Sequence, residues 1–201
     1  MSIISAGNTT TTAIVVTGDT TGNLVFTTGG ANTVALTLSN TQAATFAGTL
    51  TTAAQGIAYA SLPAGNIIQV VNGSYSTEVS TTSGTPADTG LTATITPKFS
   101  TSKILVLVSQ KVFSNNDAAN SGGANMYLLR GATTLFTAGR VAFSDGTGAM
   151  DLYFTTSYLD SPATTSATTY KTQVARYGGA GTVFVQITSC ISGITLLEIA
   201  A

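Results

Sequence analysis

Charged residues are scarce in this chain of 201 residues, and histidine is absent altogether. Charged residues make up 7% of the sequence, whereas soluble domains usually carry about a quarter. The first 97 residues contain no basic residue and only three acids, Asp19, Glu78 and Asp88. So little ionic surface gives little self-repulsion to keep free copies apart. The composition therefore favours a structural protein that buries its surface against copies of itself or against a larger body.

The absence of histidine excludes Ser-His-Asp and Cys-His catalysis and every histidine-ligated metal site. Cys190 is the only cysteine, so no intrachain disulfide forms, and its apolar surroundings indicate a small buried hydrophobe. Glycoside cleavage needs two carboxylates roughly 5–10 Å apart. The available acids, such as Asp145 and Asp151 or Asp117 and Asp160, mostly fall in turn sequences. We therefore expect no enzyme, no cofactor and no bound metal.

Two loop sequences offer weak signals for a ligand. Asn115, Asn116, Asp117 and Asn120 supply oxygen ligands for calcium but lack the regular acidic spacing of a dedicated calcium loop. Ordinary loop chemistry is the favoured interpretation. The glycine-rich residues 178–181 have no following lysine, which a phosphate-binding loop requires. We interpret them as a hairpin turn between two strands.

Basic clusters and long apolar runs are also missing. The seven basic residues are spread from Lys98 to Arg176, which leaves no electrostatic footprint for nucleic acid. The longest aliphatic run, Ile104–Val108, is far shorter than the roughly 20 residues of a membrane-spanning helix. The start, Met1–Ser5, lacks the charge and apolar stretch of a secretory signal. The expectations are no nucleic-acid partner, no membrane association, and assembly in a cytoplasm.

Residues 1–62 are a series of short β-prone pieces separated by turn residues, with a loose period of about ten residues. The pieces are Ala13–Thr17, Asn23–Thr27, Thr33–Leu38 and Ala44–Gly48. Large apolar residues are few, so a single copy would leave most backbone groups facing water or unpaired strand edges. Three copies wound about one axis would bury the apolar positions, which are Leu24, Phe26, Leu36, Leu38 and Phe46. The alternative is a disordered linker, against which the recurring β-branched residues argue.

Residues 63–201 have longer and more hydrophobic strand patterns, and we place a domain boundary at residue 62. The predicted strands are Ile67–Val71, Leu91–Thr96, Lys103–Phe113, Met126–Leu129, Thr134–Phe136, Leu152–Leu159, Thr169–Tyr177, Thr182–Ile187 and Ile194–Ile199. Their spacing and the lack of a helical apolar period predict an all-β antiparallel sandwich. The run Lys103–Phe113 is apolar on both faces, which predicts that Leu105 and Leu107 meet another subunit. The last strand is expected to be central.

Several polar and aromatic side chains of this segment are candidates for ion pairs or ligand contacts. Arg130, Arg140 and Arg176 are expected to form intersubunit or surface ion pairs with Asp151, Asp160 or Glu198 rather than to clamp a ligand. Tyrosines could stack on sugar rings at an exposed tip, although strand alternation must place at least half of the aromatic rings in the core. The candidate glycan contacts are Tyr158 and Tyr177.

Two stretches carry a resemblance to known families. Thr21–Gly30 followed by Leu36–Asn40 resembles the repeats of tail-fibre and fibre-like virion proteins of tailed bacteriophages. Residues 63–201 are similar to C1q/TNF-like jelly-roll domains, which form threefold trimers. The pieces that carry this likeness are Thr96–Val106, Ser157–Pro162 and Ile194–Ile199. The resemblance implies a homotrimeric virion component with an intertwined N-terminal β segment and a jelly-roll head.

Two functions follow as hypotheses. The first is a non-enzymatic structural protein at the virion surface, a capsid cement or decoration protein or a short fibre, whose partners are its own copies and the major capsid or tail proteins. Its N-terminal segment would be the stalk or anchor. The alternative is a tail-fibre receptor-binding tip that recognises a host cell-surface glycan through Tyr158 and Tyr177.

Overall fold

Strands account for nearly all regular structure in the part of the chain that the computed structural model describes, residues 24–28, 33–38, 44–46, 63–116 and 121–201. Within those ranges no α-helix forms, and the only helical turn is a 3-10 turn at Ile187–Ser189. The chain divides into two compact units, Met1–Ile57 and Ala58–Ala201. The expected all-β class with almost no helix is confirmed.

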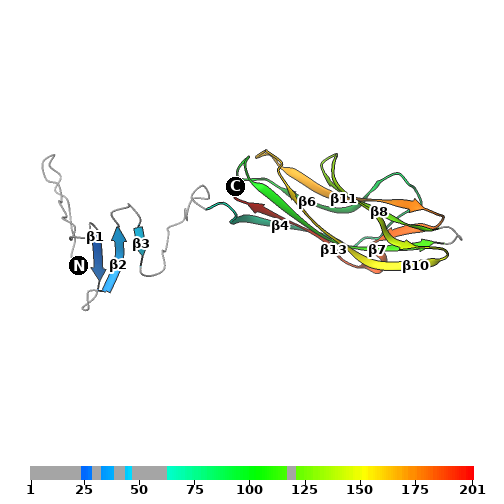
Figure 1. Ribbon diagram of the computed structural model, residues 1–201, viewed down its shortest axis with the longest axis horizontal. Helices are drawn as coiled ribbons and strands as arrows, with labels where there is room; N and C mark the ends of the chain where they lie inside the picture. The colour runs from blue at the N-terminus through cyan, green and yellow to red at the C-terminus, as the bar shows by residue number, and fades with distance from the viewer. Residues whose placement is uncertain (1–23, 29–32, 39–43, 47–62, 117–120) are drawn as a thin grey trace. The chain divides into compact units, whose positions relative to one another are not determined.

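The first unit contains a three-stranded antiparallel sheet in the order β1-β2-β3 (Figure 1). Its strands are β1 (Leu24–Thr28), β2 (Thr33–Leu38) and β3 (Ala44–Phe46). The strands pair within one chain, whereas the sequence led us to expect unpaired strands in a single copy. Short connections, residues 29–32 and 39–43, allow neighbouring strands to pair locally. The predicted strand Ala13–Thr17 lies outside the described residues.

The second unit is an antiparallel jelly-roll sandwich of two sheets. The large sheet has the order β4-β13-β7-β12-β5, with β10 paired along the other side of β7. The small sheet has the order β6-β11-β8-β9. The strands are β4 (Ile67–Tyr75), β5 (Val79–Thr81), β6 (Ala87–Ile95), β7 (Lys103–Asn116), β8 (Gly122–Arg130), β9 (Thr133–Ser144), β10 (Gly148–Asp160), β11 (Thr168–Gly178), β12 (Thr182–Val185) and β13 (Ser192–Ile199). The last strand, β13, lies between β4 and β7, so its predicted central place is confirmed.

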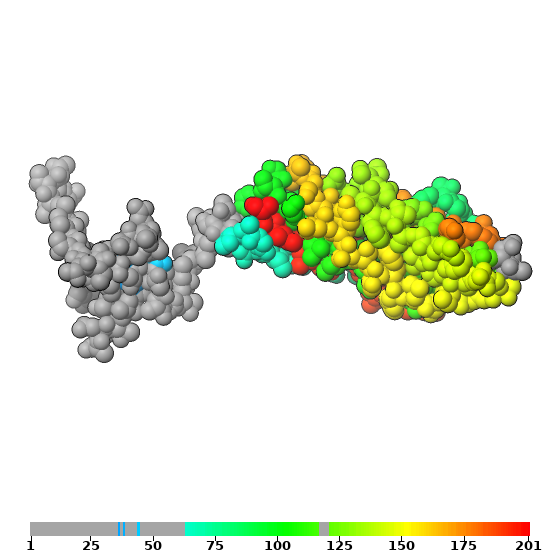
Figure 2. All heavy atoms as spheres, viewed as in Figure 1, coloured from blue at the N-terminus to red at the C-terminus, as the bar shows by residue number. Residues whose placement is uncertain are grey.

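The strand register gives the sandwich two distinct ends. At the first, which we call the base end, Ile199 lies opposite both Ile67 and Lys103. The chain terminus is fixed there, because the backbone N–H of Ala200 donates to the carbonyl of Asn66 at 2.9 Å. In the space-filling view the C-terminal residues, in red, lie beside the start of β4 (Figure 2).

The opposite end of the sandwich, which we call the tip end, is where several strands begin or finish. Gly148 of β10 lies opposite Asn116 of β7, and Gly178 of β11 lies opposite Gly122 of β8. The glycine-rich residues 178–181 follow directly and lead from β11 in the small sheet to β12 in the large sheet. The predicted hairpin is therefore wrong, because β11 and β12 belong to different sheets.

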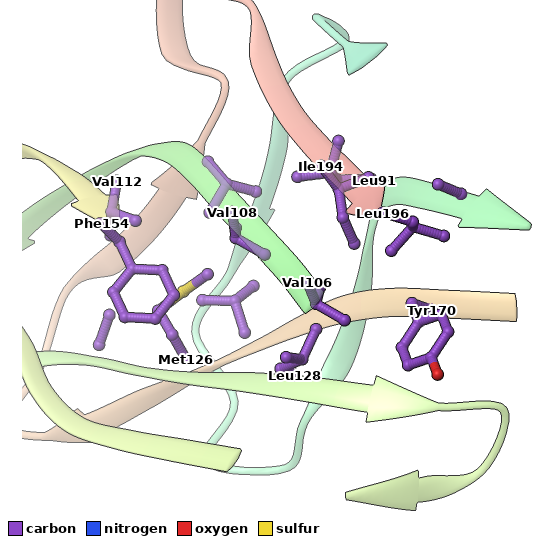
Figure 3. Close-up of a cluster of buried hydrophobic side chains, with 14 of the residues drawn as sticks. Leu91, Val106, Val108, Val112, Met126, Leu128, Phe154, Tyr170, Ile194 and Leu196 are labelled. Carbon is purple, nitrogen blue, oxygen red and sulfur yellow. The ribbon is translucent and has the colours of Figure 1, made fainter. Parts of the chain in front are cut away.

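The core lies between the two sheets and is built by alternate residues of each strand, since successive side chains in a strand point to opposite faces. Val106, Val108 and Val112 of β7 face Met126 and Leu128 of β8 across the sandwich (Figure 3). Other labelled members of the same cluster are Leu91, Phe154, Tyr170, Ile194 and Leu196. This packing fixes the inner face of every long strand and leaves the alternate residues on the outer face.

Several strand boundaries differ from the sequence prediction, which also missed β5, and two of the differences have a local cause. The strand predicted at Thr182–Ile187 stops at Val185, because Gln186 has a left-handed φ of 53° and the 3-10 turn follows. The strand predicted at Thr134–Phe136 instead runs through Ser144. Its pairing with β8 continues past Gly139 by shifting register, so the glycine does not end it.

Candidate functional site

An apolar row crosses four neighbouring strands on the outer face of the large sheet near the base end. Leu197 of β13 lies opposite Val70 of β4 on one side and Leu105 of β7 on the other. Leu105 in turn lies opposite Leu159 of β10. Directly opposite residues of an antiparallel pair share one face of the sheet. Val70, Leu197, Leu105 and Leu159 therefore form one continuous line, which we call the apolar row.

The apolar row is accessible at both of its ends. Val70 is 58% exposed and Leu159 is 52% exposed, while Leu105 and Leu197 between them are half-buried. Ile67 on the base side is also exposed. The next two rows toward the tip carry only uncharged residues, namely Asn72, Thr195, Leu107 and Ser157, then Ser74, Gly193, Ser109 and Thr155. These two rows are thus uncharged but mostly polar, and on the base side of the apolar row the exposed Lys103 lies opposite Ile199.

The predicted subunit-contact residues fall in both units. Leu105 belongs to the apolar row, and Leu107 is exposed in the next row. In the first unit, Leu36 and Leu38 are half-buried. The register pairs Leu24 with Leu38 and places Leu36 opposite Phe26 on one side and Phe46 on the other. The side chains of Leu24, Phe26 and Phe46 lie outside what the structure describes.

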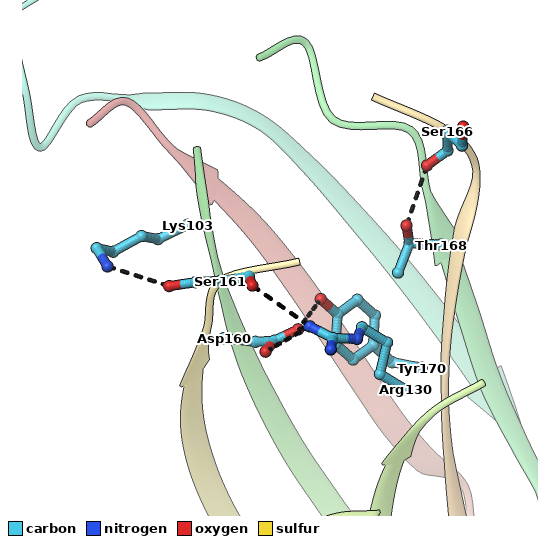
Figure 4. A network of polar contacts seen from close by, with 7 residues as sticks. All are labelled: Lys103, Arg130, Asp160, Ser161, Ser166, Thr168 and Tyr170. Atoms are coloured by element: carbon cyan, nitrogen blue, oxygen red, sulfur yellow. Dashed lines mark hydrogen bonds and ion pairs between the residues drawn. The ribbon is translucent and has the colours of Figure 1, made fainter. Parts of the chain in front are cut away.

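An ion pair between half-buried Arg130 and buried Asp160 joins the two sheets at the base end (Figure 4). Nη1 of Arg130, from the small sheet, donates to both carboxylate oxygens of Asp160 on β10, at 2.8 and 2.9 Å. The hydroxyl of Tyr170 on β11 donates to the same carboxylate at 2.6 Å. Burial, and then the bond to Asp160, raise the pKa of Tyr170 above its ordinary value. This network fastens the sheets together and leaves no group free for chemistry.

Two further charged side chains are committed to the fold. The carboxylate of Glu198 is fully buried and accepts hydrogen bonds from the backbone N–H of Lys98 at 2.7 Å and from Gln69 at 2.5 Å. Arg176 donates to the backbone carbonyls of Thr82, at 2.8 Å, and Gly178, at 3.0 Å. The expectation that Arg176 pairs with an acid is not met among the described residues, because carbonyl oxygens satisfy its guanidinium instead.

A hollow of about 480 Å³ opens at the tip end, and we call it the tip hollow. It is lined by Ser121, Arg140, Phe143, Tyr177 and Gly178. The guanidinium of Arg140 lies 3.9 Å from the ring centroid of Phe143 and 5.8 Å from that of Tyr177. The two rings meet edge to face, with centroids 6.2 Å apart. The hollow thus combines one positive charge with two aromatic rings.

The structure separates the two tyrosines that the sequence offered as glycan contacts. Tyr177 is 38% exposed and lines the tip hollow. Tyr158 is partly buried and packs against the hydrophobic core, because its register position opposite Val106 lies on the inner face of β10. Only Tyr177 is placed where a ligand in the tip hollow would reach it.

The sequence reasoning missed the tip hollow and most of the apolar row. Arg140 was expected to pair with an acid, but the ion pairs formed by the described residues join Arg130 to Asp160, Lys111 to Asp151 and Lys171 to Asp88. The missed members of the row, Val70, Leu197 and Leu159, had a usable signal. Each is an apolar residue directly beside a residue of the core or packed against it, namely Val71, Leu196 and Tyr158.

Catalytic and metal-binding groups do not gather within the described ranges. No cluster of three or more His, Cys, Asp or Glu side chains able to hold a metal ion occurs there. Asp151 forms an ion pair with Lys111 at 2.5 Å, and Asp160 pairs with Arg130. Cys190 is a half-buried free thiol, more exposed than the buried hydrophobe expected, while Asp117 and Asn120 lie outside the described residues. Nor does the described part contain a helix long and apolar enough to cross a membrane.

Comparisons with known proteins find few likenesses. No protein-family model and no curated protein matches the chain. Among solved structures, it is similar to that of infectious bursal disease virus Gx strain, at 16% identity and a TM-score of 0.38 over 66% of this chain and 32% of that one. It is also similar to the VP2 subviral particle of infectious bursal disease virus, at 17% identity and a TM-score of 0.37 over 67% of this chain and 34% of that one. The likeness to latent PorU of Porphyromonas gingivalis has 13% identity and a TM-score of 0.29 over 69% of this chain and 13% of that one.

The chain thus spans about a third or less of the length of these solved chains. Identities and TM-scores this low carry no inference about function. What the chain does must be argued from its own residues.

Proposed function

We propose that this chain is a non-enzymatic structural component of a bacteriophage virion, a homotrimer at the particle surface that serves as a capsid cement or decoration protein or as a short fibre. The apolar row is the observation that carries the proposal. Full burial of a Val or Leu side chain stabilises an assembly by roughly 1.5–3 kcal/mol, and Val70 and Leu159 are more than half exposed in the single chain. Exposed apolar residues gathered in one place are typical of an interaction surface.

The charge distribution favours further copies of this chain as the occupant of the apolar row. The row and the two rows on its tip side carry no charge, so these three rows do not repel the same rows of another copy. With 7% charged residues and a net charge of −1, the chain has little charge with which to select a charged partner. In the proposed trimer Leu105 and Leu107 of each copy lie in the contact.

The N-terminal segment, residues 1–62, is proposed as the stalk or anchor that joins the head to the particle. Its pairing positions Leu24, Phe26, Leu36, Leu38 and Phe46 would contact other copies or the major capsid or tail proteins. Addition of a strand to a neighbouring sheet is one physical route, because main-chain hydrogen bonds supply affinity without charge. Neither nucleic acid nor membrane is part of the proposal.

The molar mass of the full chain in solution tests the trimer. Sedimentation or light scattering at micromolar concentration should give three times the 20.2 kDa chain mass. Leu159→Asp and Val70→Asp each place a carboxylate in the contact and should weaken the trimer at least about 100-fold. Thr137→Asp, an exposed position of the small sheet, is the matched control and should leave the mass unchanged. A monomeric wild-type chain would contradict the proposal.

The number of copies per particle tests the virion role. Quantitative mass spectrometry of purified phage particles should find the chain in numbers divisible by three. Many copies indicate a protein that decorates the shell, and a few copies indicate a fibre. Particles that lack the chain would exclude the role altogether.

A second candidate function is supported by a separate observation. Tyr177 is exposed in the tip hollow, at the end of the sandwich opposite the apolar row. This placement favours a receptor-binding tip that recognises a cell-surface glycan. The two functions are compatible in one molecule because they use different ends of the head.

A further inference from the structure

We propose that the tip hollow binds a carboxylated sugar, with Arg140 pairing with the carboxylate and Tyr177 packing against the sugar ring. The inference deepens the second candidate function and does not depend on the trimer. Three features of the hollow carry it. They are an arginine charge that pairs with no acid among the described residues, a backbone that aims this side chain, and a lining suited to a sugar.

The first feature is the state of the Arg140 charge. None of the described residues forms an ion pair with it or accepts a hydrogen bond from its guanidinium. A guanidinium stays charged at all ordinary pH values and carries five N–H donors in its plane. The guanidinium carbon lies 3.9 Å from the ring centroid of Phe143, and a contact with a ring does not consume the N–H donors of a guanidinium. Those donors match a planar carboxylate, which accepts two parallel hydrogen bonds.

The second feature is the backbone that carries Arg140. Arg140 and Ala142 have φ values of 59° and 47°, in the left-handed region that non-glycine residues rarely adopt. The register between β8 and β9 shifts twice alongside, between Gly122 and Ala124 and between Ala124 and Met126. Bulges of this kind turn a side chain away from its regular direction and occur often beside binding sites. In β9 the bulges lie beside Arg140, whose guanidinium lies over the ring of Phe143.

The third feature is the size and chemistry of the lining. A volume of about 480 Å³ falls within the range of small-molecule sites, roughly 300–1,000 Å³. The ring of Tyr177 offers an apolar face and a polar tip, which suits the C–H face and the hydroxyls of a sugar. Ser121 adds a hydroxyl that both donates and accepts. A single guanidinium provides for one carboxylate, whereas nucleic acid requires a run of basic residues.

The experiment measures binding of two matched pairs of probes to the full chain by isothermal titration calorimetry. Tetragalacturonate is compared with its methyl ester, and sialyllactose with lactose, because each pair differs in the presence of a free carboxylate. At least one carboxylated probe should bind tenfold or more tightly than its neutral counterpart. Arg140→Ala should remove that difference, and Arg140→Lys should retain part of it, because lysine keeps the charge but not the planar fork. Tyr177→Ala should weaken both members of the pair that binds.

Two variants are controls, and the outcomes separate the hypotheses. Lys98→Ala removes one positive charge at an exposed position of the base end, and Tyr153→Ala removes an exposed ring from the large sheet. Both should leave binding unchanged. Equal binding of neutral and carboxylated probes would overturn the inference but preserve a glycan-binding tip, whereas no binding of any probe would overturn both. Equal weakening by Lys98→Ala and Arg140→Ala would also overturn it, since general charge attraction would then explain binding.

Discussion

Arg130 and Arg140 lie at opposite ends of the same sandwich, and their surroundings differ in almost every respect. Arg130 donates to both carboxylate oxygens of Asp160, which is 6% exposed and also bound by Tyr170. Arg140 is exposed and stacks on Phe143, with no acid paired to it among the described residues. One residue type thus fastens two sheets together at the base and presents a charge to solvent at the tip.

Burial explains the difference between the two ends. A carboxylate removed from water must be paired and hydrogen-bonded, because an isolated buried charge costs several kcal/mol. Asp160 therefore requires Arg130 and Tyr170. An exposed guanidinium is hydrated and can remain unpaired at little cost. The base end is accordingly where a substitution should lower stability, and the tip end is where it should alter binding.

The largest effect on stability is expected from breaking the base network. Asp160→Ala removes the carboxylate and leaves the Arg130 charge and the Tyr170 hydroxyl without their acceptor. We expect the free energy of unfolding to fall by about 3 kcal/mol, as measured by denaturant titration. Asp151→Ala is the matched control, because Asp151 pairs with Lys111 on the exposed face and its loss should cost less than about 1 kcal/mol. Similar losses from both variants would show that burial does not distinguish them.

A smaller and pH-dependent effect is expected from Tyr170→Phe. Loss of the hydrogen bond to Asp160 should lower the free energy of unfolding by about 1–2 kcal/mol near neutral pH. Burial raises the pKa of Tyr170, so the folded protein keeps a proton that the unfolded chain releases above about pH 10. The stability that this hydroxyl contributes is therefore fully present below about pH 10 and is lost as pH rises further.

The comparison of wild type and Tyr170→Phe across pH isolates this contribution. Denaturant titrations at pH 8, 10 and 11 should show a difference in unfolding free energy that is constant between pH 8 and the onset of tyrosine ionisation and then shrinks. The slope attributable to one proton is at most about 1.4 kcal/mol per pH unit. A difference that stays constant to pH 11 would mean that the hydroxyl ionises alike in the folded and unfolded states.

The smallest effect on stability is expected at the tip. Arg140→Ala removes an exposed side chain that takes part in no described ion pair, so the free energy of unfolding should change by less than about 0.5 kcal/mol. Denaturant or thermal unfolding of the Arg140→Ala variant measures this change in free energy, and the binding assay is run on the same variant. A loss comparable to that of Asp160→Ala would mean that the stack on Phe143 supports the fold instead of serving a ligand.

Much of the fold could be predicted from the spacing of apolar residues. Apolar runs in Lys103–Phe113 and Ile194–Ile199 predicted strands, and the apolar residues flanking Glu198 predicted a central last strand, as the structure confirms. Strand ends were less accurate, because pairing with β8 carries β9 past Gly139 and a left-handed Gln186 ends β12. Both depend on neighbouring strands, which a local pattern does not contain.

The candidate sites were predictable only in part. Leu105 and Leu107 were identified because their strand is apolar on both faces, but the apolar row that contains Leu105 depends on register across four strands. Asp160 was named as a possible acid for an arginine, and the structure pairs it with Arg130. Among the described residues of one chain neither Arg140 nor Arg176 pairs with an acid, and Arg176 donates to backbone carbonyls instead, while their expected pairing between subunits stays a prediction.

The sequence by itself determined the all-β class, the scarcity of charge and the exclusion of histidine chemistry, because these follow from composition and from the period of apolar residues. Only the tertiary structure decided which arginine is buried against an acid and which apolar residues line up on one face. The physical reason is that contacts between residues distant in sequence arise from strand register and from the closure of one sheet on another. The apolar row and the tip hollow both depend on such contacts.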